Sequence, residues 1–395
     1  MTIVTDAAVI ISAVRTPIGE AGRSLANVPA WDLGILVAKE AIVRAGIDPV
    51  TCDDVIFGET IGGGGNVGRF VGLAAGVPHD VPGMSVIRAC ATGLEAVTQA
   101  ATAIWAGIGE AFLTGGAESM SQQPWLMKKP SSAYPRRPPE IVVAPPSHPP
   151  AMASLSVGIN VGESSAERFG ITREDQDRWA LRSHQRAVRA IDACTFEPEI
   201  VAVPVAQRKG EPRIFDTDER PRRDTSLEKL SALPPAYVEG GTVTAGNSSG
   251  INDGAASLVV TSAKRAEQLG LQPRAVIRGW ASAGVDPAFT GTGPIEAVPR
   301  ALKRAGLAID DLDIIEINEA FAAQTIACVR ELGLNPDKVN PNGGAIALGH
   351  PVGATGARLL VSLLHELERT GGRYGCATMC AGGGLGSAAI IERVG

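Results

Sequence analysis

A stretch near the beginning of the chain recurs near its end at a constant spacing of 260 residues. Residues 43–59 read VRAGIDPVTCDDVIFGE and residues 303–319 read KRAGLAIDDLDIIEINE, so the Arg-Ala-Gly triplets and the closing glutamates are each 260 positions apart. Each copy reads as an amphipathic helix closed by glycine, a short polar turn and a β-branched strand. Similar units also arise by chance, but the shared spacing favours a duplication that builds the chain from two similar halves.

The same spacing separates Cys90 from His350. Each of these residues precedes a helix-like stretch, residues 94–105 in the first half and residues 357–367 in the second. If a βα unit is duplicated, Cys90 and His350 occupy equivalent positions, where the two halves can face each other.

A region of different character separates the two halves. Residues 124–150 contain nine prolines, and because proline fixes φ and lacks an N–H group, no regular helix or central strand is expected there. The basic residues of this region are Lys128, Lys129, Arg136 and Arg137. They either attract phosphate groups or lie in a solvated or subunit-contacting loop, and the second interpretation is preferred. Residues 163–190 then read as a helix, with Thr172 as a plausible N-cap.

The composition fits a globular protein whose core rests on small aliphatic side chains. Glycine is abundant at 47 residues and aromatic residues make up only 4%, which indicates tight turns and close backbone approaches. A net charge of −6 argues against a nucleic-acid partner, which requires a basic face. The sequence has no apolar run of about 18 residues and no secretory signal pattern at its start, so a cytoplasmic protein without a membrane span is expected.

The six cysteines are scattered along the chain and are expected to be free thiols. Cys376 and Cys380 stand four residues apart, but no second Cys/His pair accompanies them. No metal site is therefore expected.

The first of four unusual segments, residues 85–96, places Cys90 where a strand gives way to a helix, with Gly93 close behind. The free N–H groups and the positive dipole end of a helix lower a thiol pKa and can hold an oxyanion. This pattern predicts a reactive thiolate. A buried structural cysteine is the alternative.

Three further segments combine polar or reactive side chains with glycine. Residues 343–356 place five glycines around His350, and histidine is the usual base that activates a thiol; a phosphate-binding loop is the alternative, but its lysine is absent. Residues 375–386 place Cys380 before a glycine run whose N–H groups could form an oxyanion site, unless this is simply a buried strand ending in a turn. Residues 318–319 end a buried strand, where polar groups need partners; an asparagine N-cap of the next helix is the alternative.

Taken together, these motifs resemble those of the thiolase family. The four segments look like the family's nucleophile segment and its Asn-Glu-Ala-Phe, Gly-His-Pro-x-Gly and Cys-x-Gly motifs. The similar stretches are residues 88–93, 318–321, 343–356, 380–382, 12–17, 115–120 and 244–254. The resemblance extends over nearly the whole chain, and the four catalytic motifs follow the family's order.

The resemblance implies an α/β fold, the thiolase-like five-layer αβαβα fold made of two duplicated halves with an inserted loop domain. Residues 1–119 together with about 250–275 would form the N-terminal half, and residues 276–395 the C-terminal half. Residues 120–249 would form the inserted domain, which contacts coenzyme A and a neighbouring subunit. The resemblance further implies a homodimer or homotetramer, and a place in a fatty-acid oxidation complex stays open.

The activity implied by the resemblance is acyl transfer between coenzyme A thioesters, by cleavage of a 3-ketoacyl-CoA or by Claisen condensation with acetyl-CoA. Cys90 would attack the donor thioester and carry the acyl group, and His350 would take the thiol proton. Cys380 would be the acid/base at the acyl acceptor. His350 and a water held by Asn318 would stabilise the enolate oxygen, while the N–H groups of Cys90 and Gly382 would form a second oxyanion hole.

The substrate contacts implied by the resemblance are less closely matched. Ser249 stands in the family's contact position for the pantetheine arm, and Arg222 or Arg223 is the candidate for the adenine and phosphate end. Residues 156–163 replace a His-Met-Gly-like stretch of many family members, so the side chains over the acyl pocket differ. The preferred length of the substrate's acyl chain therefore stays open. Acyl-CoA and CoA are substrates, and no cofactor is implied. The expected setting is fatty-acid metabolism, including β-oxidation.

Two alternative functions are weighed against a thiolase. A decarboxylating ketoacyl synthase of the same superfamily pairs its cysteine with two histidines or with His and Asn, whereas here the third group is Cys380. A non-catalytic acyl-CoA-binding scaffold would be expected to lose Cys90, His350 or Cys380, and all three are present.

Overall fold

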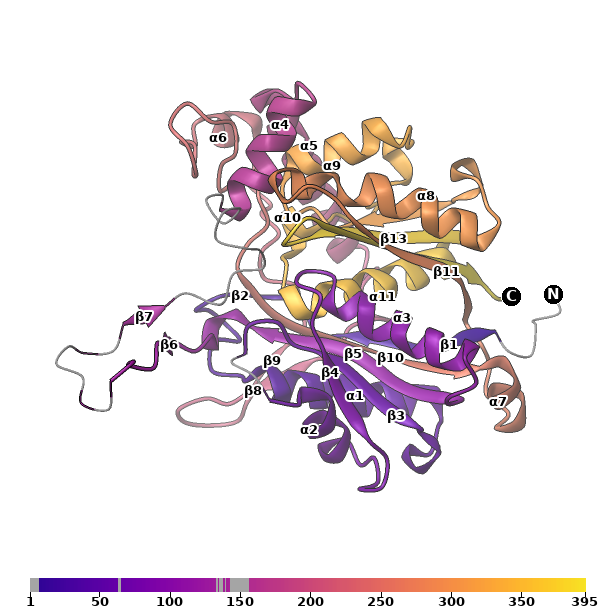
Figure 1. Cartoon of the computed structure of the whole chain (residues 1–395). Helices are drawn as coiled ribbons and strands as arrows, with labels where there is room; N and C mark the ends of the chain where they lie inside the picture. The colour runs from indigo at the N-terminus through magenta and orange to yellow at the C-terminus, as the bar shows by residue number, and fades with distance from the viewer. Residues whose placement is uncertain (1–6, 63–64, 133, 135–137, 139, 143–155) are drawn as a thin grey trace.

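The computed structural model describes residues 7–62, 65–132, 134, 138, 140–142 and 156–395 of the chain. Helices and sheets alternate in five layers, with one pair of helices in the middle and further helices on both outer faces (Figure 1). The predicted five-layer αβαβα architecture is therefore confirmed.

The first half contributes five strands of the main sheet. Their order across the sheet is β4 (Gly83–Val86), β3 (Asp54–Gly58), β5 (Ala111–Ser119), β10 (Asn252–Ser262) and β1 (Ala8–Arg15). β3 runs parallel to β4 and β5, whereas β10 runs antiparallel to β5 and β1. The strand after the inserted region thus returns to the first half's sheet.

The second half repeats this arrangement. Its strands follow the order β12 (Ile314–Ile317), β13 (Tyr374–Ala381), β14 (Leu385–Arg393) and β11 (Ala275–Gly284). β12 is parallel to β13, and β14 is antiparallel to β13 and β11, as in the first half. A parallel bridge between Ile315 and Val339 takes the place of β4. The common order and directions support the duplication inferred from the spacing.

The two half-sheets are joined edge to edge. β1 pairs with β11 in antiparallel fashion through Val9 with Val276 and Ile10 with Ala275. This short junction makes one continuous row of nine strands, and β2 (Gly19–Glu20), which pairs with β10, is the tenth strand of the sheet.

Six helices form the three helical layers. α1 (Ala30–Ala45) and α2 (Val67–Ala74) cover the outer face of the first half, and α8 (Gly293–Ala305) and α9 (Ala322–Glu331) cover that of the second. α3 (Thr92–Trp105) and α11 (Val352–Thr370) pack against each other in the central layer (Figure 1). α11 contacts strands of both halves, so it holds them together in addition to the β1–β11 pairing.

The 260-residue spacing extends to the ends of equivalent helices. α1 ends at Ala45 and α8 at Ala305, and each is closed by a glycine. Gly46 and Gly306 adopt φ values of 65° and 69°, and the N–H group of each reaches two carbonyls of the preceding turn. Glycine adopts this left-handed conformation without the steric cost of a Cβ atom, so it terminates both helices at the same point.

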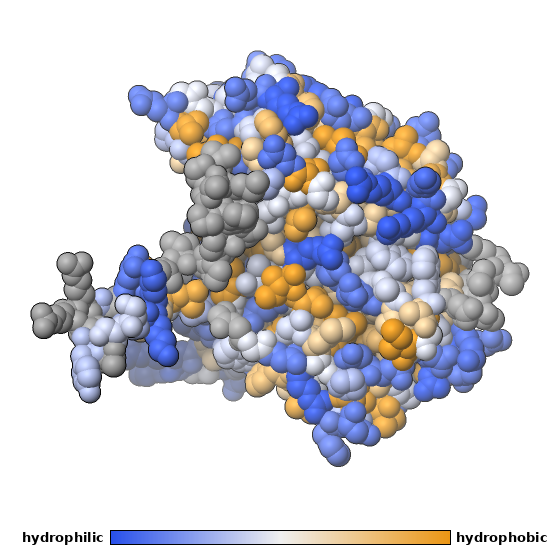
Figure 2. Space-filling view, in the orientation of Figure 1, coloured by the Kyte–Doolittle hydropathy of each residue, from blue (hydrophilic) through white to orange (hydrophobic). Residues whose placement is uncertain are grey.

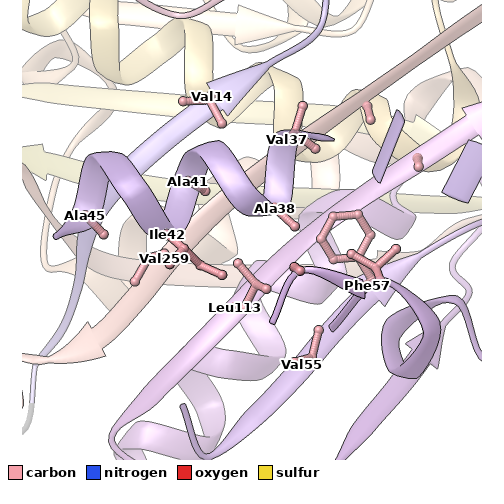
Figure 3. Packing of buried hydrophobic residues seen from close by; sticks show 14 of the residues in the cluster. Val14, Val37, Ala38, Ala41, Ile42, Ala45, Val55, Phe57, Leu113 and Val259 are labelled. Atoms are coloured by element: carbon pink, nitrogen blue, oxygen red, sulfur yellow. The ribbon is translucent and has the colours of Figure 1, made fainter. Parts of the chain in front are cut away.

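The core of the first half forms where α1 lies across the sheet. The apolar face of α1 presents Ala38, Ala41 and Ile42 to Leu113 of β5 and Val259 of β10, all of them buried (Figure 3). Burying a side chain of the size of Ile42, Leu113 or Val259 stabilises the fold by roughly 1.5–3 kcal/mol. Packing of this face therefore fixes α1 on the sheet.

The inserted region contains short elements, and one prediction there is wrong. Residues 163–190 do not form one helix, because the chain breaks at Gly170, whose φ is 59°. α4 (Ser164–Arg168) precedes the break and α5 (Arg173–Asp192) follows it. Thr172 caps α5 as predicted, in a reciprocal capping box with Asp175.

The remaining elements of the inserted region are small. They are η2 (Met120–Gln122), β6 (Leu126–Met127), β7 (Ile141–Val142), the π-helical segment η4 (Gly158–Glu163), β8 (Val203–Val205), β9 (Arg213–Phe215) and α6 (Leu227–Ser231). β6 and β7 form a short hairpin that projects from the body of the protein (Figure 1). Arg136 and Arg137 of the basic cluster lie outside the described residues.

Short connecting elements complete the fold. They are α7 (Ala263–Gln268), α10 (Ala345–Leu348), η1 (Pro49–Thr51), η5 (Pro287–Thr292), η6 (Ile309–Asp311) and η7 (Pro336–Lys338). Within the part of the chain that the structure describes, every helix is too short or too polar to span a bilayer.

Candidate active site

Cys90 lies in the loop between β4 and α3, two residues before the helix begins. Its neighbour Ala89 adopts a left-handed conformation with φ of 46°, a geometry that costs a residue with a side chain about 1–3 kcal/mol. The hydroxyl of Thr92 accepts the N–H group of Arg88 at 2.8 Å and closes this turn. The turn thus holds Cys90, which is half-buried, at the N-terminus of α3.

The prediction of a low thiol pKa at Cys90 is wrong. Burial raises its pKa above the usual value of 9.0, and the Glu118 carboxylate adds to the rise. Hydrogen bonding by the N–H groups of Gly382 and of Cys90 itself opposes the rise without cancelling it. The helix N-terminus contributes as expected, but desolvation of the charged sulfur outweighs it.

Glycines bring the N-termini of α3 and α11 into backbone contact. A Cβ atom on Gly93 would lie 2.8 Å from the nitrogen of Ala357 and 2.9 Å from the oxygen of Gly353. A Cβ atom on Gly356 would lie 2.2 Å from the nitrogen of Leu94. Only glycine permits such a crossing. Because Cys90 and His350 each lie two residues before the start of these helices, the crossing carries both toward one place.

His350 is buried and is held at both its backbone and its ring. Its N–H group donates to Oδ1 of Asn252 at 2.9 Å, and its ring Nδ1 lies 2.7 Å from Oγ1 of Thr355. Nε2 lies 3.4 Å from Nδ2 of Asn318. Burial lowers the pKa of His350 to about 3, with a further contribution from the positive charge of Arg358. The ring is therefore neutral at physiological pH.

Asn318 lies just beyond the end of β12 and is fully buried. Its side-chain oxygen has no hydrogen-bond partner within the described portion of the chain. The alternative role as an N-cap is wrong, since α9 begins at Ala322 and Phe321 occupies its N-cap position. The structure thus places Asn318 beside the His350 ring with one acceptor atom available for a small ligand.

Glu319, next to Asn318, has a full set of protein partners that the sequence did not reveal. Its Oε1 accepts hydrogen bonds from Nε1 of Trp179 at 2.9 Å and Nδ2 of Asn340 at 3.0 Å. Its Oε2 accepts from Oγ of Ser183 at 2.6 Å and from the N–H group of Ile346 at 3.2 Å. All four partners are donors, so this side chain is an ionised carboxylate that ties α5 to the segment preceding His350.

Cys380 lies near the end of β13 and is buried, with 2% of its surface exposed. Burial raises its pKa well above 9.0, and the nearby Cys90 thiol adds to the rise. Its apolar neighbours are Val161, Val243 and Phe321. Cys90 packs against the buried cluster that contains Met379 and Ala381 of β13, so the end of this strand lies beside the start of α3.

Glu118 is a further residue at this site whose role the sequence did not indicate. It is fully buried at the end of β5 and accepts the N–H groups of Thr60 at 3.1 Å, Ile61 at 3.2 Å and Gly353 at 2.8 Å. Burial raises its pKa to about 7, despite these donors. Glu118 therefore fastens the first turn of α11 next to Cys90. Its place in the motif at residues 115–120 was the only signal in the sequence.

The stretch that departs from the family pattern forms the π-helical segment η4. Its Val161 belongs to the same buried cluster as Cys380, and its Gly158 is so close to the ring of Tyr237 that a Cβ atom there would lie 2.2 Å from the ring. Tyr237 in turn packs edge-on against Phe321, with ring centroids 5.9 Å apart. The glycine at position 158 thus leaves room for the edge-on pair of Tyr237 and Phe321, and Phe321 belongs to the buried cluster that contains Cys380.

The three predicted contacts for coenzyme A occupy different surroundings. Ser249 is half-buried, and its N–H group donates to the carbonyl of Ala320 at 3.0 Å, which places it beside the Asn318 segment. Arg222 is exposed and lines a cavity of about 190 Å³. Arg223 instead pairs with Asp192, with contacts of 2.9 and 2.5 Å, and is not among the residues lining that cavity.

This cavity lies between α5, α6 and the segment that precedes β10. Its lining residues include His184, Arg220, Arg222, Lys229, Leu230 and Leu233. Nδ1 of His184 accepts the N–H group of Arg222 at 3.2 Å. Burial and the neighbouring arginines lower the pKa of His184 to about 4, so its ring is a neutral acceptor that fixes the Arg222 backbone.

Comparison with known proteins identifies the class to which this fold and site belong. The family model described as thiolase, N-terminal domain, matches residues 8–264, and the model described as thiolase, C-terminal domain, matches residues 271–393. The chain belongs to the thiolase family and is an acyltransferase.

Individual relatives cover nearly the whole chain. An acetyl-CoA acetyltransferase of Cupriavidus necator is 46% identical over 98% of this chain and 99% of its own length. A beta-ketoadipyl-CoA thiolase of Pseudomonas aeruginosa is 48% identical over 98% of both chains. The crystal structure of human mitochondrial 3-ketoacyl-CoA thiolase in complex with CoA is 36% identical, covers 98% of both chains and superposes with a TM-score of 0.92. These matches favour a thiolase over a ketoacyl synthase or a non-catalytic scaffold.

Proposed function

We propose that the enzyme transfers acyl groups between coenzyme A thioesters through an acyl-enzyme on Cys90. The reaction is cleavage of a 3-ketoacyl-CoA by CoA in one direction and Claisen condensation of an acyl-CoA with acetyl-CoA in the other. The observation that carries this proposal is the crossing of α3 and α11 at Gly93 and Gly356, which brings the segments of Cys90 and His350 together, while Cys90 packs against the buried cluster that contains Met379 and Ala381 of β13. The CoA bound to the human relative supports CoA as the common ligand.

In the first half-reaction, Nε2 of His350 takes the proton of the Cys90 thiol while the sulfur attacks the carbonyl carbon of the donor thioester. The N–H groups of Cys90 and Gly382 hold the resulting oxyanion. The adduct collapses as the C–S bond to CoA breaks, and the CoA sulfur leaves with the proton from His350. Two easier steps replace one difficult acyl transfer.

The protonation states of the resting site suit this sequence. A raised pKa at Cys90 and a lowered pKa at His350 both favour a neutral thiol beside a neutral imidazole. Proton transfer between them therefore belongs to the step in which the carbonyl is attacked. The site then avoids holding a buried ion pair before substrate arrives.

In the second half-reaction, the Cys380 thiol first loses its proton to solvent, and the thiolate then removes an α-proton from acetyl-CoA. The carbanion attacks the acyl carbon, the C–S bond to Cys90 breaks, and the released Cys90 sulfur regains one proton from solvent. His350 and a water held by Asn318 stabilise the enolate oxygen. The unpartnered, buried Oδ1 of Asn318 supports this role, because a water donating to it would satisfy an otherwise costly acceptor. The burial that raises the pKa of Cys380 also makes its thiolate a strong base.

Coenzyme A is proposed to run from Ser249 toward the cavity beside α6. Arg222 lines that cavity and supplies positive charge for the phosphates, whereas Lys229 is paired there with Asp224 at 2.6 Å. The reaction uses CoA thioesters as substrates and needs no further cofactor. The proposed setting is cytoplasmic fatty-acid metabolism, including β-oxidation, which cell fractionation and growth on fatty acids would test.

A second copy of the chain is proposed to pair with the free edge of β4. Among the described strands, β4 pairs only with β3, so its other edge is open to a further strand, although the Gly83 carbonyl accepts a hydrogen bond from Nδ2 of Asn66 at 2.7 Å. Apolar side chains gather on this face of the molecule (Figure 2); Phe70, Met84 and Ile87 are 52%, 40% and 69% exposed. A homodimer joined here, or a tetramer of two such dimers, would be distinguished from a monomer by light scattering.

Mass spectrometry of the intact protein after mixing with acetyl-CoA tests the catalytic proposal. We expect an acetyl group on the Cys90 peptide, and no such adduct in a Cys90→Ser variant, whose turnover should fall by orders of magnitude. Binding of acetyl-CoA without modification would instead support a scaffold. A rate profile over 3-ketoacyl-CoA substrates of increasing length, measured in both directions, would assign the acyl chain.

A further inference from the structure

The Thr355 hydroxyl lies between two groups of the loop that carries His350. Thr355 is fully buried in the first turn of α11. Its Oγ1 is 2.7 Å from Nδ1 of His350 and 2.8 Å from the carbonyl oxygen of Pro351. Both distances are those of good hydrogen bonds, so this single hydroxyl links the imidazole to the backbone of the helix.

The direction of these two hydrogen bonds follows from the proton count. A carbonyl oxygen only accepts, and two oxygens 2.8 Å apart repel each other unless a proton lies between them. The Thr355 proton therefore points to the Pro351 oxygen. Because a hydroxyl has only one proton, its contact with the ring is one in which it accepts the Nδ1–H group of His350.

The contacts on the other side of the ring agree with this assignment. Nε2 faces Nδ2 of Asn318, which is a donor group, at 3.4 Å. A neutral imidazole has one N–H group, and with the proton on Nδ1 the lone pair is on Nε2. The backbone of His350 is fixed separately by Asn252, whose Oδ1 accepts its N–H group at 2.9 Å. The ring orientation thus depends on Thr355 and the backbone position on Asn252.

We propose that Thr355 is a positioning residue, which sets the tautomer of His350 so that Nε2 is the atom that takes the Cys90 proton. The inference rests on the proposed function for its catalytic meaning, but the tautomer is a property of the resting protein. When Nε2 takes the proton, the ring becomes a cation, and the Thr355 oxygen already accepts the hydrogen bond from its other N–H group. A hydrogen-bonding partner of this kind orients a histidine and raises its basicity.

The charged neighbours make this support more important. Arg358, on the next turn of α11, is a buried cation whose charge opposes protonation of the ring. Burial opposes it as well. Thr355 is the group whose hydrogen bond favours the protonated ring, so it works against both effects during the acyl-transfer step.

The test compares Thr355→Val, which keeps the shape of the side chain but removes the hydroxyl, with Thr355→Ser, which keeps the hydroxyl. Nitrogen NMR of histidine-labelled protein reads the tautomer directly, and a chain with five histidines gives few signals. The His350 signal is assigned by its loss in His350→Gln. We expect a proton on Nδ1 in the unmodified protein and in Thr355→Ser, and a mixture or a proton on Nε2 in Thr355→Val.

The rate of iodoacetamide alkylation at Cys90, followed by peptide mass spectrometry across pH, is the second measurement. We expect Thr355→Val to lower this rate about 10- to 100-fold near neutral pH and Thr355→Ser to stay within about twofold. A proton on Nε2 in the unmodified protein, or an unchanged tautomer in Thr355→Val, would overturn the inference. Absence of an acetyl adduct in the unmodified protein would instead overturn the proposed function, whatever the tautomer.

Discussion

Replacing Glu319 with glutamine tests how strongly the carboxylate beside the active site holds the second half together. The substitution keeps the size of the side chain and removes one acceptor oxygen. In the native protein, each of the two oxygens accepts two hydrogen bonds. The donors are Trp179 and Ser183 of α5, and Asn340 and Ile346 of the segment before His350. In the variant, the amide NH2 group must face two of these donors.

The cost can be worked from these contacts. The least harmful orientation turns the NH2 group toward Ser183, whose hydroxyl can rotate to accept, and toward Ile346, whose N–H group then loses its acceptor. An unsatisfied buried donor costs about 1–3 kcal/mol, and the surviving hydrogen bonds lose the extra strength of an ionised acceptor. Glutamine carries no charge, so the variant avoids the free-energy cost of burying one, and this offsets part of the loss. We expect Glu319→Gln to lower the free energy of unfolding by about 3 kcal/mol.

Urea-induced unfolding followed by fluorescence and circular dichroism measures this change, with the protomer concentration held fixed. The matched control is Glu59→Gln at the equivalent position of the first half. Burial raises the pKa of the half-buried Glu59, so neutralising it should change stability by less than about 1 kcal/mol. If the two variants lost equal stability, or if Glu319→Gln lost none, the clamp assigned to Glu319 would be wrong.

Three further outcomes follow from the same structure. Gly356→Ala puts a Cβ atom into the backbone of α3 and should lower the melting temperature sharply, whereas Gly284→Ala, which meets no atom within 4 Å, should leave it nearly unchanged. The pKa of Glu118 is about 7 in the folded protein and 4.5 in the unfolded chain, so the folded state loses stability as pH rises from 4.5 to 7. This loss is about 3 kcal/mol, and it should be absent from the unfolding curves of Glu118→Gln measured across the same pH range. Arg222→Ala should raise the KM for CoA about tenfold, equivalent to about 1.4 kcal/mol, with a smaller change for Arg223→Ala; an equal effect of both would contradict the cavity assignment.

Much of the architecture could be predicted because duplication leaves a regular trace. Gly46 and Gly306 could be predicted as helix ends from local chemistry, since each glycine closes a helix in a left-handed conformation, and their common spacing reflects the duplication. Cys90 and His350 share this spacing, and each lies two residues before a helix of the central layer. Such features are local in sequence, so a single chain is enough to read them.

The features that could not be predicted are long-range or depend on burial. The four donors around Glu319 come from segments at residues 179–183 and 340–346, and no local pattern indicates that they meet. The helix expected at residues 163–190 has suitable periodicity throughout, yet Gly170 breaks it because the chain must turn between α4 and α5. The Cys90 pKa depends on how deeply the fold buries the sulfur, which the sequence does not state.

At Cys90, the cost of burying a charged sulfur competes with stabilisation by the helix ends and N–H groups that surround it. Two helices start beside the site, and the dipole of each N-terminus stabilises a negative charge by typically 0.3–1 kcal/mol, which rises to about 2 kcal/mol where water is excluded. Two such ends, with the N–H groups of Cys90 and Gly382, still leave the thiol pKa above 9.0, so desolvation is the larger effect in the resting protein. The same N–H groups are better used by an oxyanion on the substrate, whose charge appears only during the reaction. A site at the crossing of α3 and α11 therefore favours the transition state over a resting thiolate, and a Cys90 thiolate that was abundant at neutral pH without substrate would contradict this reasoning.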